Sequence, residues 1–323
     1  MRNRPLSVAV PILLLSFHAS PALAADDMLT PRSVAMGDSL RADASGALGP
    51  LLNPAGMTLR RAYTLEAMYG FNVQDTGSHL LASIVDSVTS RVSAGVYYSF
   101  VHSDPKFTLL PGGPTQGRRE GNETGLALAL PLGNWFSFGI TTKYIRFTTD
   151  APNPAFVDAK TTPMVPERLA IDSTVATATA NGFTMDGGIA LRLGESFSAA
   201  VTGQNLIPLR SIEAPMALGT GLAYRYGTQL TLALDFVVNF NKYQKPDGSD
   251  IVSYKLGGGL EWLIAGKVAL RAGAGWDSGK PATFVSGGLA YVHQSFAIDL
   301  SYRQQVQHGV DSYIVAGLRV FLQ

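Results

Sequence analysis

The stretch Thr228–Phe240, with the sequence TQLTLALDFVVNF, alternates apolar and polar side chains along its length. From Leu230 onward its even positions hold leucine, phenylalanine or valine, and its odd positions hold mostly small or polar residues, including Asp235. Successive side chains of a β-strand point to opposite faces, so this stretch predicts a strand with one apolar and one polar face. Both a half-buried soluble sheet and a membrane barrel contain strands of this kind.

Fourteen such segments follow one another, with no helical domain between them. Each is close to the ten residues that a tilted strand needs to cross the hydrocarbon layer of a membrane. Two of them, 79–88 and 282–293, alternate poorly, so the count carries an uncertainty of two strands. The predicted strands are about 62–71, 79–88, 91–101, 122–131, 134–147, 181–193, 195–206, 214–225, 228–240, 251–263, 266–277, 282–293, 294–303 and 310–321.

The connections between these segments are alternately short and long, as in outer-membrane barrels, which have short periplasmic turns and longer outer loops. A soluble sandwich has no reason to sort its loops in this way. The sequence therefore predicts an all-β fold, a transmembrane antiparallel β-barrel of about fourteen strands with both ends in the periplasm. The short connections are expected at 89–90, 132–133, 194, 226–227, 265 and 293–294, and the long ones around 72–78, 102–121, 148–180, 207–213, 241–250, 278–281 and 304–309.

The first 24 residues have the features of a cleavable export signal. Arg2 and Arg4 precede an apolar run from Leu6 to Phe17, and Pro21–Ala24 ends in the small-x-small pattern that signal peptidase cleaves. The alternative, a membrane anchor, is disfavoured because the run is well short of the roughly 20 residues that a spanning helix needs. The chain contains no cysteine, so it offers no lipoprotein acylation site, no disulfide and no thiolate metal site.

The composition favours a barrel over a soluble enzyme. Charged residues make up 15% of the chain, against about a quarter in average proteins, and the formal net charge is +1. A lipid-facing surface removes the need for charge on that band, and near-neutrality gives no reason to expect nucleic acid as a partner. Because no linker divides the mature chain, we expect residues 62–323 to form one barrel domain.

The segment between the signal and the first strand does not read as a strand, and it carries three short motifs. These motifs, with two later ones, resemble those of the FadL-type outer-membrane transport superfamily, which includes the PorV-like barrels of type IX secretion. Singly the motifs are weak, but they occur in the family's order along the mature chain. They are Met36-Gly37, Ala42-Asp43-Ala44-Ser45, Asn53-Pro54-Ala55-Gly56, the end of Val201–Leu206 (Gln-Asn-Leu) and Leu270-Arg-Ala-Gly273.

The resemblance implies a fourteen-stranded barrel whose lumen holds residues 25–61 as a hatch. It implies passage of hydrophobic, fatty-acid-like small molecules across the outer membrane, with a lateral exit into the bilayer as one route and an apolar site beside the hatch or at the outer loops. The implied partners are outer-membrane lipid and a hydrophobic small molecule, with no cofactor and no enzymatic activity. The expected hatch or gating residues are Met36, Gly37, Asp43, Asn53, Pro54, Ala55 and Gly56.

An alternative within the same resemblance is a PorV-like scaffold or shuttle that transports nothing and binds proteins of a secretion system. The chain also departs from the family pattern. It is shorter than the fatty-acid transporters, which leaves less sequence for an outer ligand groove. Barrel chains usually end on phenylalanine, whereas here Phe321 is followed by Leu322 and Gln323.

The residues Asn53 and Pro54 suit a hatch for a physical reason. Proline fixes its own φ and disfavours helix at the preceding residue, while Gly56 permits a turn. The side chain of Asn53 can bond to nearby backbone in the lumen. The alternative is an ordinary turn before the first strand.

Two further features could suggest chemistry. Gly37–Leu40 spells the GDSL signature of a lipase family, but that family's Asp-x-x-His element is absent, so we disfavour a hydrolase. Histidines 79, 102, 293 and 308 show no spacing typical of a metal site, and we expect them to be satisfied loop or interface residues. In the long connection 148–180, residues 163–180 are expected to form either a short helix over the barrel mouth or a mobile loop.

Overall fold

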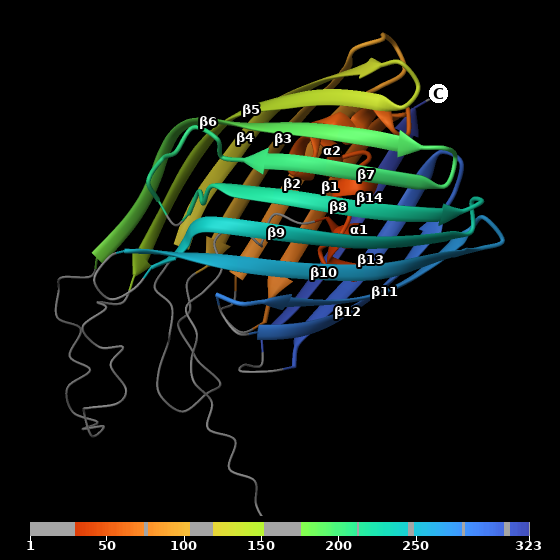
Figure 1. The fold of residues 1–323 in the computed structure, drawn as a ribbon. Helices are drawn as coiled ribbons and strands as arrows, with labels where there is room; N and C mark the ends of the chain where they lie inside the picture. Colours follow the sequence, from red (N-terminus) through yellow and green to blue (C-terminus); the bar gives the residue numbers. More distant parts are fainter. Residues whose placement is uncertain are drawn as a thin grey trace, which may run out of the picture.

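The computed structural model describes residues 30–73, 77–103, 119–151, 176–211, 213–244, 249–279, 282–306 and 311–322. Within these residues fourteen strands form one closed barrel, shown in Figure 1. The strands are β1 (Tyr63–Asn72), β2 (Gly77–Asp86), β3 (Ser93–Ser103), β4 (Arg119–Leu132), β5 (Phe136–Ala151), β6 (Ala176–Leu193), β7 (Phe197–Gln204), β8 (Ala217–Tyr226), β9 (Leu230–Gln244), β10 (Asp250–Ile264), β11 (Val268–Asp277), β12 (Ala282–Val292), β13 (Phe296–Gln305) and β14 (Ser312–Leu322).

Every strand pairs antiparallel with its neighbours in sequence, and β1 pairs with β14 to close the ring, with Tyr63 opposite Leu322. Closure leaves no sheet edge unpaired at the seam, which is a requirement for a barrel in lipid. The predicted fold class and the predicted count of fourteen strands are therefore confirmed. The two poorly alternating segments are strands as well, β2 and β12.

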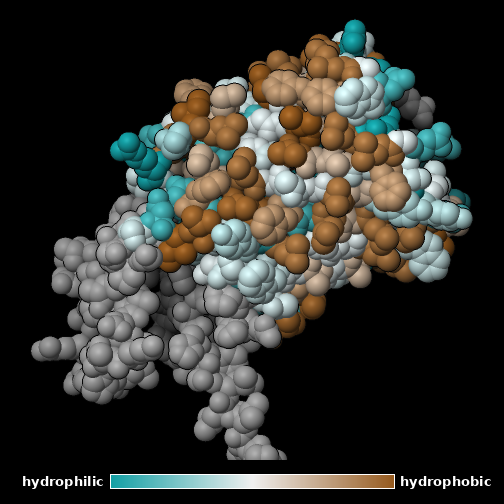
Figure 2. All heavy atoms as spheres, in the orientation of Figure 1, coloured by the Kyte–Doolittle hydropathy of each residue, from teal (hydrophilic) through white to brown (hydrophobic). Residues whose placement is uncertain are grey.

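Alternation along each strand separates an apolar outer face from a more polar inner face. In β9, Leu232, Leu234 and Phe236 are exposed on the outside, whereas Thr231 and Asp235 are buried inside. Figure 2 shows brown, apolar side chains among paler ones across the barrel face in view. A wide apolar surface of this kind matches a lipid environment and would be unfavourable in water. None of the helices among the described residues is long and apolar enough to cross a membrane.

The barrel has two different ends. At one end, which we call the turn end, the even-numbered strands β2 to β12 are joined to the following strands by short turns, such as 133–135 and 227–229. At the other, the loop end, β5 and β6 extend further than predicted, to Ala151 and from Ala176. The expected connection 148–180 is thus too long at both ends, because Thr148–Ala151 and Ala176–Ala180 pair as strand. Residues 176–180 are not helical, and 163–175 lie outside the described residues.

Residues 30–59 lie inside the barrel and contain four short helical pieces. These are α1 (Pro31–Ala35), η1 (Arg41–Asp43), α2 (Leu48–Leu52) and η2 (Pro54–Thr58), and α1 and α2 appear within the ring of strands in Figure 1. We call residues 30–60 the N-terminal segment. Thr30 caps α1, with its Oγ1 accepting from the Ser33 amide, and proline follows at the first helical position, as is common. Asn53 caps η2 in the same way.

Glycines in the wall let the backbone of the N-terminal segment approach the strands. A Cβ placed on Gly259 would lie 2.5 Å from the Met36 carbonyl oxygen, and one on Gly273 would lie 2.2 Å from the Gly37 nitrogen. On the other side of the lumen, a Cβ on Gly188 would lie 2.1 Å from Asn53 Oδ1. The wall glycines therefore face the Met-Gly and Asn-Pro motifs, and close packing is the reason for glycine in these strands.

Candidate functional site

Ion pairs between the N-terminal segment and four different strands, β8, β9, β10 and β13, hold the segment in the lumen. Arg32 lies 2.8 Å from Glu261 of β10, and Arg41 lies 3.1 Å from Asp235 of β9. Asp38 approaches Lys255 of β10 at 2.8 Å, and it also approaches Arg303 of β13 at 3.0 Å. Most of these side chains are buried, and buried charges are stable only when they are paired in this way.

Asp43 is an acidic residue of the N-terminal segment that forms ion pairs with three arginines. Its carboxylate is fully buried and lies 2.7 Å from Arg32, 3.1 Å from Arg60 and 2.5 Å from Arg225 of β8. Burial raises the pKa of Asp43, but the three guanidinium groups outweigh burial and bring that pKa below its ordinary value of 3.8. The carboxylate is therefore ionised at neutral pH. It links two arginines of the segment to each other and to Arg225 of the wall.

The residues predicted to form a hatch lie together inside the barrel. Asn53 donates from Nδ2 to the Arg41 carbonyl at 2.9 Å and accepts from the Ala55 amide at 3.1 Å, so it fixes the turn between α2 and η2. A Cβ on Gly56 would lie 2.4 Å from the Ala44 carbonyl oxygen, which explains glycine at that position. All seven are buried, and Gly37 lies beside Gly273 of the wall; they are Met36, Gly37, Asp43, Asn53, Pro54, Ala55 and Gly56. Their role in gating stays a prediction.

The residues that suggested a lipase or a metal site have structural surroundings. Ser39 is buried, and its hydroxyl donates to the Met36 carbonyl at 2.5 Å. His79 was expected to be a satisfied loop or interface residue; it is hydrogen-bonded, to Tyr313 (3.1 Å) and Ser99 (2.9 Å), but it lies buried within β2. Among the described residues, no group of three or more His, Cys, Asp or Glu side chains is placed to hold a metal ion.

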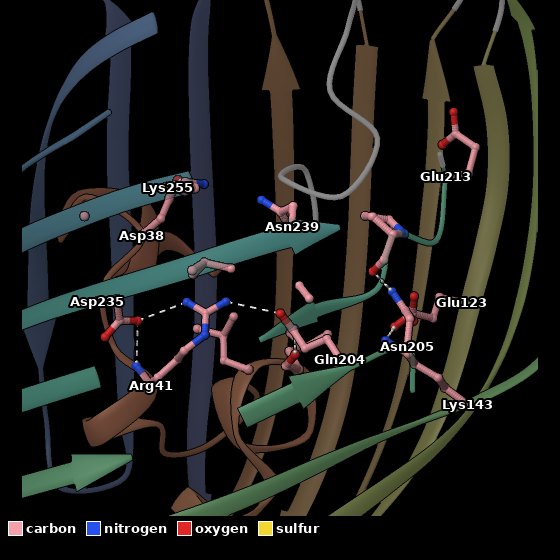
Figure 3. Close-up of a pocket in the computed structure, with 16 residues that line it drawn as sticks. Asp38, Arg41, Glu123, Lys143, Gln204, Asn205, Glu213, Asp235, Asn239 and Lys255 are labelled. Carbon is pink, nitrogen blue, oxygen red and sulfur yellow. Dashed lines mark hydrogen bonds and ion pairs between the residues drawn. The ribbon is translucent and has the colours of Figure 1, made fainter. Parts of the chain in front are cut away.

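A cavity of about 100 Å³ lies between the N-terminal segment and the wall. Figure 3 shows that charged and amide side chains from the segment, from β4, β5 and β9, and from the end of β7 converge on it. The lining is mixed, because the apolar side chains of Leu51, Leu52 and Val237 also face the cavity. An apolar site beside the hatch therefore stays a prediction. The lining includes Asp38, Arg41, Glu123, Lys143, Gln204, Asn205, Glu213, Asp235, Asn239 and Lys255.

A second group of buried apolar side chains lies inside the barrel towards the loop end. We define the apolar cluster as Val101, Ile145, Phe147, Ala180 and Ala214, which are all buried and in mutual contact. Val101, Phe147 and Ala180 lie in one row across the wall, since Val101 pairs with Gly121, Gly121 with Phe147, and Phe147 with Ala180. The row belongs to β3, β4, β5 and β6. It gives the inner wall a hydrophobic patch above the charged segment.

Comparison with solved structures finds barrels of the same architecture. The chain is similar to a CymD monoaromatic hydrocarbon channel, with a TM-score of 0.65 and 14% identity, covering 91% of this chain and 97% of that one. It is similar to the Ralstonia pickettii toluene transporter TbuX (0.64, 13%, 91% and 98%) and to a Pseudomonas aeruginosa FadL homologue (0.59, 12%, 90% and 97%). The chain has the FadL-type barrel fold. Neither the protein-family models nor the curated protein sequences contain a match to it.

Within this FadL-type fold, sequence reasoning found the motifs of the N-terminal segment but missed their partners in the wall. Asp235, Lys255 and Glu261 were visible only as charged residues at inward positions of strands. It also missed the apolar cluster. The sequence of β5 does contain a signal for the cluster. Its inward residues change from polar, at Thr141 and Lys143, to apolar, at Ile145 and Phe147.

Proposed function

We propose that this chain resides in the outer membrane and passes hydrophobic small molecules across it. The apolar outer face of a closed barrel supports the location, and we retain residues 1–24 as a cleaved signal and 25–61 as a hatch. The FadL-type fold supports the activity, since the similar structures include a toluene transporter and a monoaromatic hydrocarbon channel. The single observation that carries the proposal is the apolar cluster, a group of buried hydrophobic side chains on the inner wall.

The charged N-terminal segment argues against a straight axial path. A molecule moving along the barrel axis would have to displace the segment and break the ion pairs of Arg32, Asp38, Arg41 and Asp43 with the wall. Leaving one partner of a buried ion pair without the other costs about 3–5 kcal/mol. Several such losses exceed what a small apolar ligand can supply by binding, so we place the exit route above the segment.

The wall offers a lateral route next to β7. With eight residues, β7 is the shortest strand, and it pairs with β6 only between Gly187 and Leu193. Beyond Gln204 the chain leaves the sheet. Leu206 and Ile207 are exposed on the outside, whereas Leu209 packs against the apolar cluster inside. Apolar side chains of one segment thus link the inner cluster to the outer surface, as a lateral path for a hydrophobic molecule requires.

Two classes of cargo follow from two different arguments. The sequence resemblance implies fatty-acid-like molecules, and the similar structures point to single aromatic rings. Both share an apolar body, and burial of each methylene contributes about 0.8 kcal/mol, so either can bind an apolar surface of this kind. We therefore state the cargo as a hydrophobic small molecule, and the assay below compares a radiolabelled hydrocarbon, toluene, with a radiolabelled fatty acid, decanoate.

Uptake into cells with an intact lipopolysaccharide leaflet tests the proposal, because that leaflet slows direct entry of apolar solutes. Cells producing the protein should take up toluene or decanoate faster than cells lacking it. Val101→Asn should abolish the difference, because it places an amide in the apolar cluster. Val101→Ala is the matched control, because it changes the same position but keeps the cluster apolar, and it should retain uptake.

Equal uptake in cells with and without the protein would contradict the proposal. The PorV-like alternative predicts this result together with a secreted protein that co-purifies in stoichiometric amount. Heat-modifiable migration on gels, which reports barrel assembly, should be the same for both variants.

A further inference from the structure

The connection after β7 bends into the barrel instead of projecting from it. We call residues 205–211 the strap. Its start is bonded to β6, with the Asn205 amide donating to Asp186 Oδ1 at 2.7 Å and the Leu206 amide donating to the Met185 carbonyl at 2.8 Å. Asn205 and Arg210 both have a φ of +52°, a left-handed conformation that is uncommon for residues with a side chain. Two such positions turn the strap inwards and then back towards β8.

The strap places one leucine against the apolar cluster. Leu209 packs on the cluster, and its Cδ2 lies 2.9 Å from the position that a Cβ on Gly182 would occupy. Gly182 is at an inward position of β6, so the missing side chain creates the space into which Leu209 fits. Close by, a Cβ on Gly121 would lie 2.3 Å from Phe147 Cδ1, so the Phe147 ring lies over a second glycine. The inner wall is therefore hollowed at two glycines, and Leu209 covers one of them.

A buried ion pair ties the chain just beyond the strap to the same surface. Arg119 Nε donates to Glu213 Oε2 at 3.0 Å, and Thr149 donates to Glu213 Oε1 at 2.7 Å. The Arg119 guanidinium also lies 5.1 Å from the centre of the Phe147 ring, so it contacts the ion pair and the apolar cluster together. Because the charges of Arg119 and Glu213 satisfy each other, the surface around Phe147 favours a ligand without charge.

We propose that Leu209 is a built-in occupant of a binding site for a neutral apolar molecule about the size of one aromatic ring. The ligand binds against Val101, Ile145 and Phe147 by displacing Leu209, and the strap then moves away from β6. This inference rests on the proposed function and deepens it, since it names the site, the class of ligand and the segment that must move. It also explains why Leu209 points into the barrel while Leu206 and Ile207 of the same strap are exposed outside.

The test compares leucines of the same strap that face opposite ways. In Leu209→Ala the site is no longer occupied by a side chain. Because burial of a leucine side chain contributes about 1.5–3 kcal/mol, fluorobenzene should bind roughly tenfold more tightly or better, measured by ¹⁹F NMR on purified barrels in nanodiscs. Leu206→Ala removes an outward-facing leucine beside Gly187 and Gly203, and it should bind as the unmodified protein does. Leu209→Met refills the site and should also bind as the unmodified protein does.

A crystal soaked with bromobenzene locates the ligand independently, since bromine gives an anomalous signal. We expect the peak beside Phe147, with Leu209 displaced. If Leu209→Ala assembles but binds fluorobenzene no better than Leu206→Ala, or if bromine lies elsewhere, the inference is wrong. If Leu209→Ala fails to assemble, the position of bromine in the unmodified protein and the binding by Leu209→Met decide.

The uptake assay separates this inference from the proposed function. Binding at Phe147 without protein-dependent uptake would leave the site in place and refute transport. Uptake that persists while binding is insensitive to Leu209 would leave transport in place and refute the role of the strap.

Discussion

The two halves of the lumen differ in chemistry. In the half towards the turn end, the N-terminal segment fills the space and is tied to the wall by buried ion pairs such as Arg41 with Asp235. Towards the loop end, the inner wall carries an apolar cluster around Phe147, and Leu209 of the strap packs against it. Charged contacts are costly to break one at a time, whereas apolar contacts can be exchanged for a ligand of similar shape. We infer that the first half closes the barrel and the second admits the cargo.

Deleting residues 30–60 should have the largest effect on this comparison. The inward-facing charges of the wall would then line an empty lumen, and water and ions would enter it. Planar bilayers should show a closed baseline for the unmodified protein and a porin-like conductance for the deletion, as expected when a barrel of this size loses its filling. Heat-modifiable migration is the assembly control. A deleted barrel that assembles and stays closed would show that the segment does not fill the pore.

Removing the charge of Asp43 should have the next largest effect. Asp43→Asn leaves three arginines without their shared carboxylate, which should cost about 3–5 kcal/mol of the free energy that keeps the segment docked. Hydrogen exchange of the backbone amides in α1 and η2 should accelerate, while exchange in the strands stays unchanged. Glu195→Gln, which removes an exposed carboxylate in a turn at the same end, is the control and should have no effect. Equal exchange rates in the two variants would contradict the role given to Asp43.

Two neighbouring glycines of β10 give a smaller and more local test. Gly259→Ala brings a Cβ to 2.5 Å from the Met36 carbonyl, and overpacking of this kind should cost about 1–3 kcal/mol, seen as faster exchange around Met36 and Gly37. Gly258→Ala adds the same methyl group to the outer face, where the nearest atom is 3.5 Å away, and should leave exchange unchanged. The same response in both variants would show that close backbone approach does not explain glycine at 259.

The pH dependence of docking should be the smallest effect near neutrality. The pKa of Asp43 is lowered, so its contribution to docking is fully present above its ordinary value of 3.8 and is lost as the pH falls through the lower folded value. Exchange in α1 should therefore change little, apart from its intrinsic pH dependence, between about pH 7 and about pH 5, and protection should fall only in stronger acid. A loss of protection already at about pH 5 would mean that another group controls docking.

The fold could be predicted from sequence because alternate residues of a strand point to opposite faces, so the apolar and polar faces appear as a two-residue period. Thr228–Phe240 shows this well, and β9 has the predicted exposed and buried positions. Strand ends were less predictable. Beyond Lys143, β5 continues with Arg146 and Thr148 outside and Ile145 and Phe147 inside, which inverts the pattern used to recognise a membrane strand.

The site could be predicted only in part, because its contacts join residues far apart in the chain. The Asn53 motif indicated a structured turn, which local chemistry explains. Arg32 and Glu261, by contrast, are 229 residues apart, and nothing in the sequence near either residue names its partner. The role of the strap could not be predicted for the same reason, because Leu209 packs into a space beside Gly182 of β6, a contact that the sequence does not indicate.

The central claim is that hydrophobic molecules bypass the N-terminal segment, and locking that segment tests it most directly. The chain has no cysteine, so Ala35→Cys with Gly288→Cys introduces one disulfide between α1 and β12. A Cβ on Gly288 lies 2.6 Å from the Cβ of Ala35, so the two need to part by about 1 Å to reach disulfide geometry. With α1 locked and the other end of the segment continuing into β1, the account predicts the same toluene uptake by oxidised and reduced cells. Uptake that is lost on oxidation and restored by a reductant would show that the cargo passes through the segment, and would contradict the account.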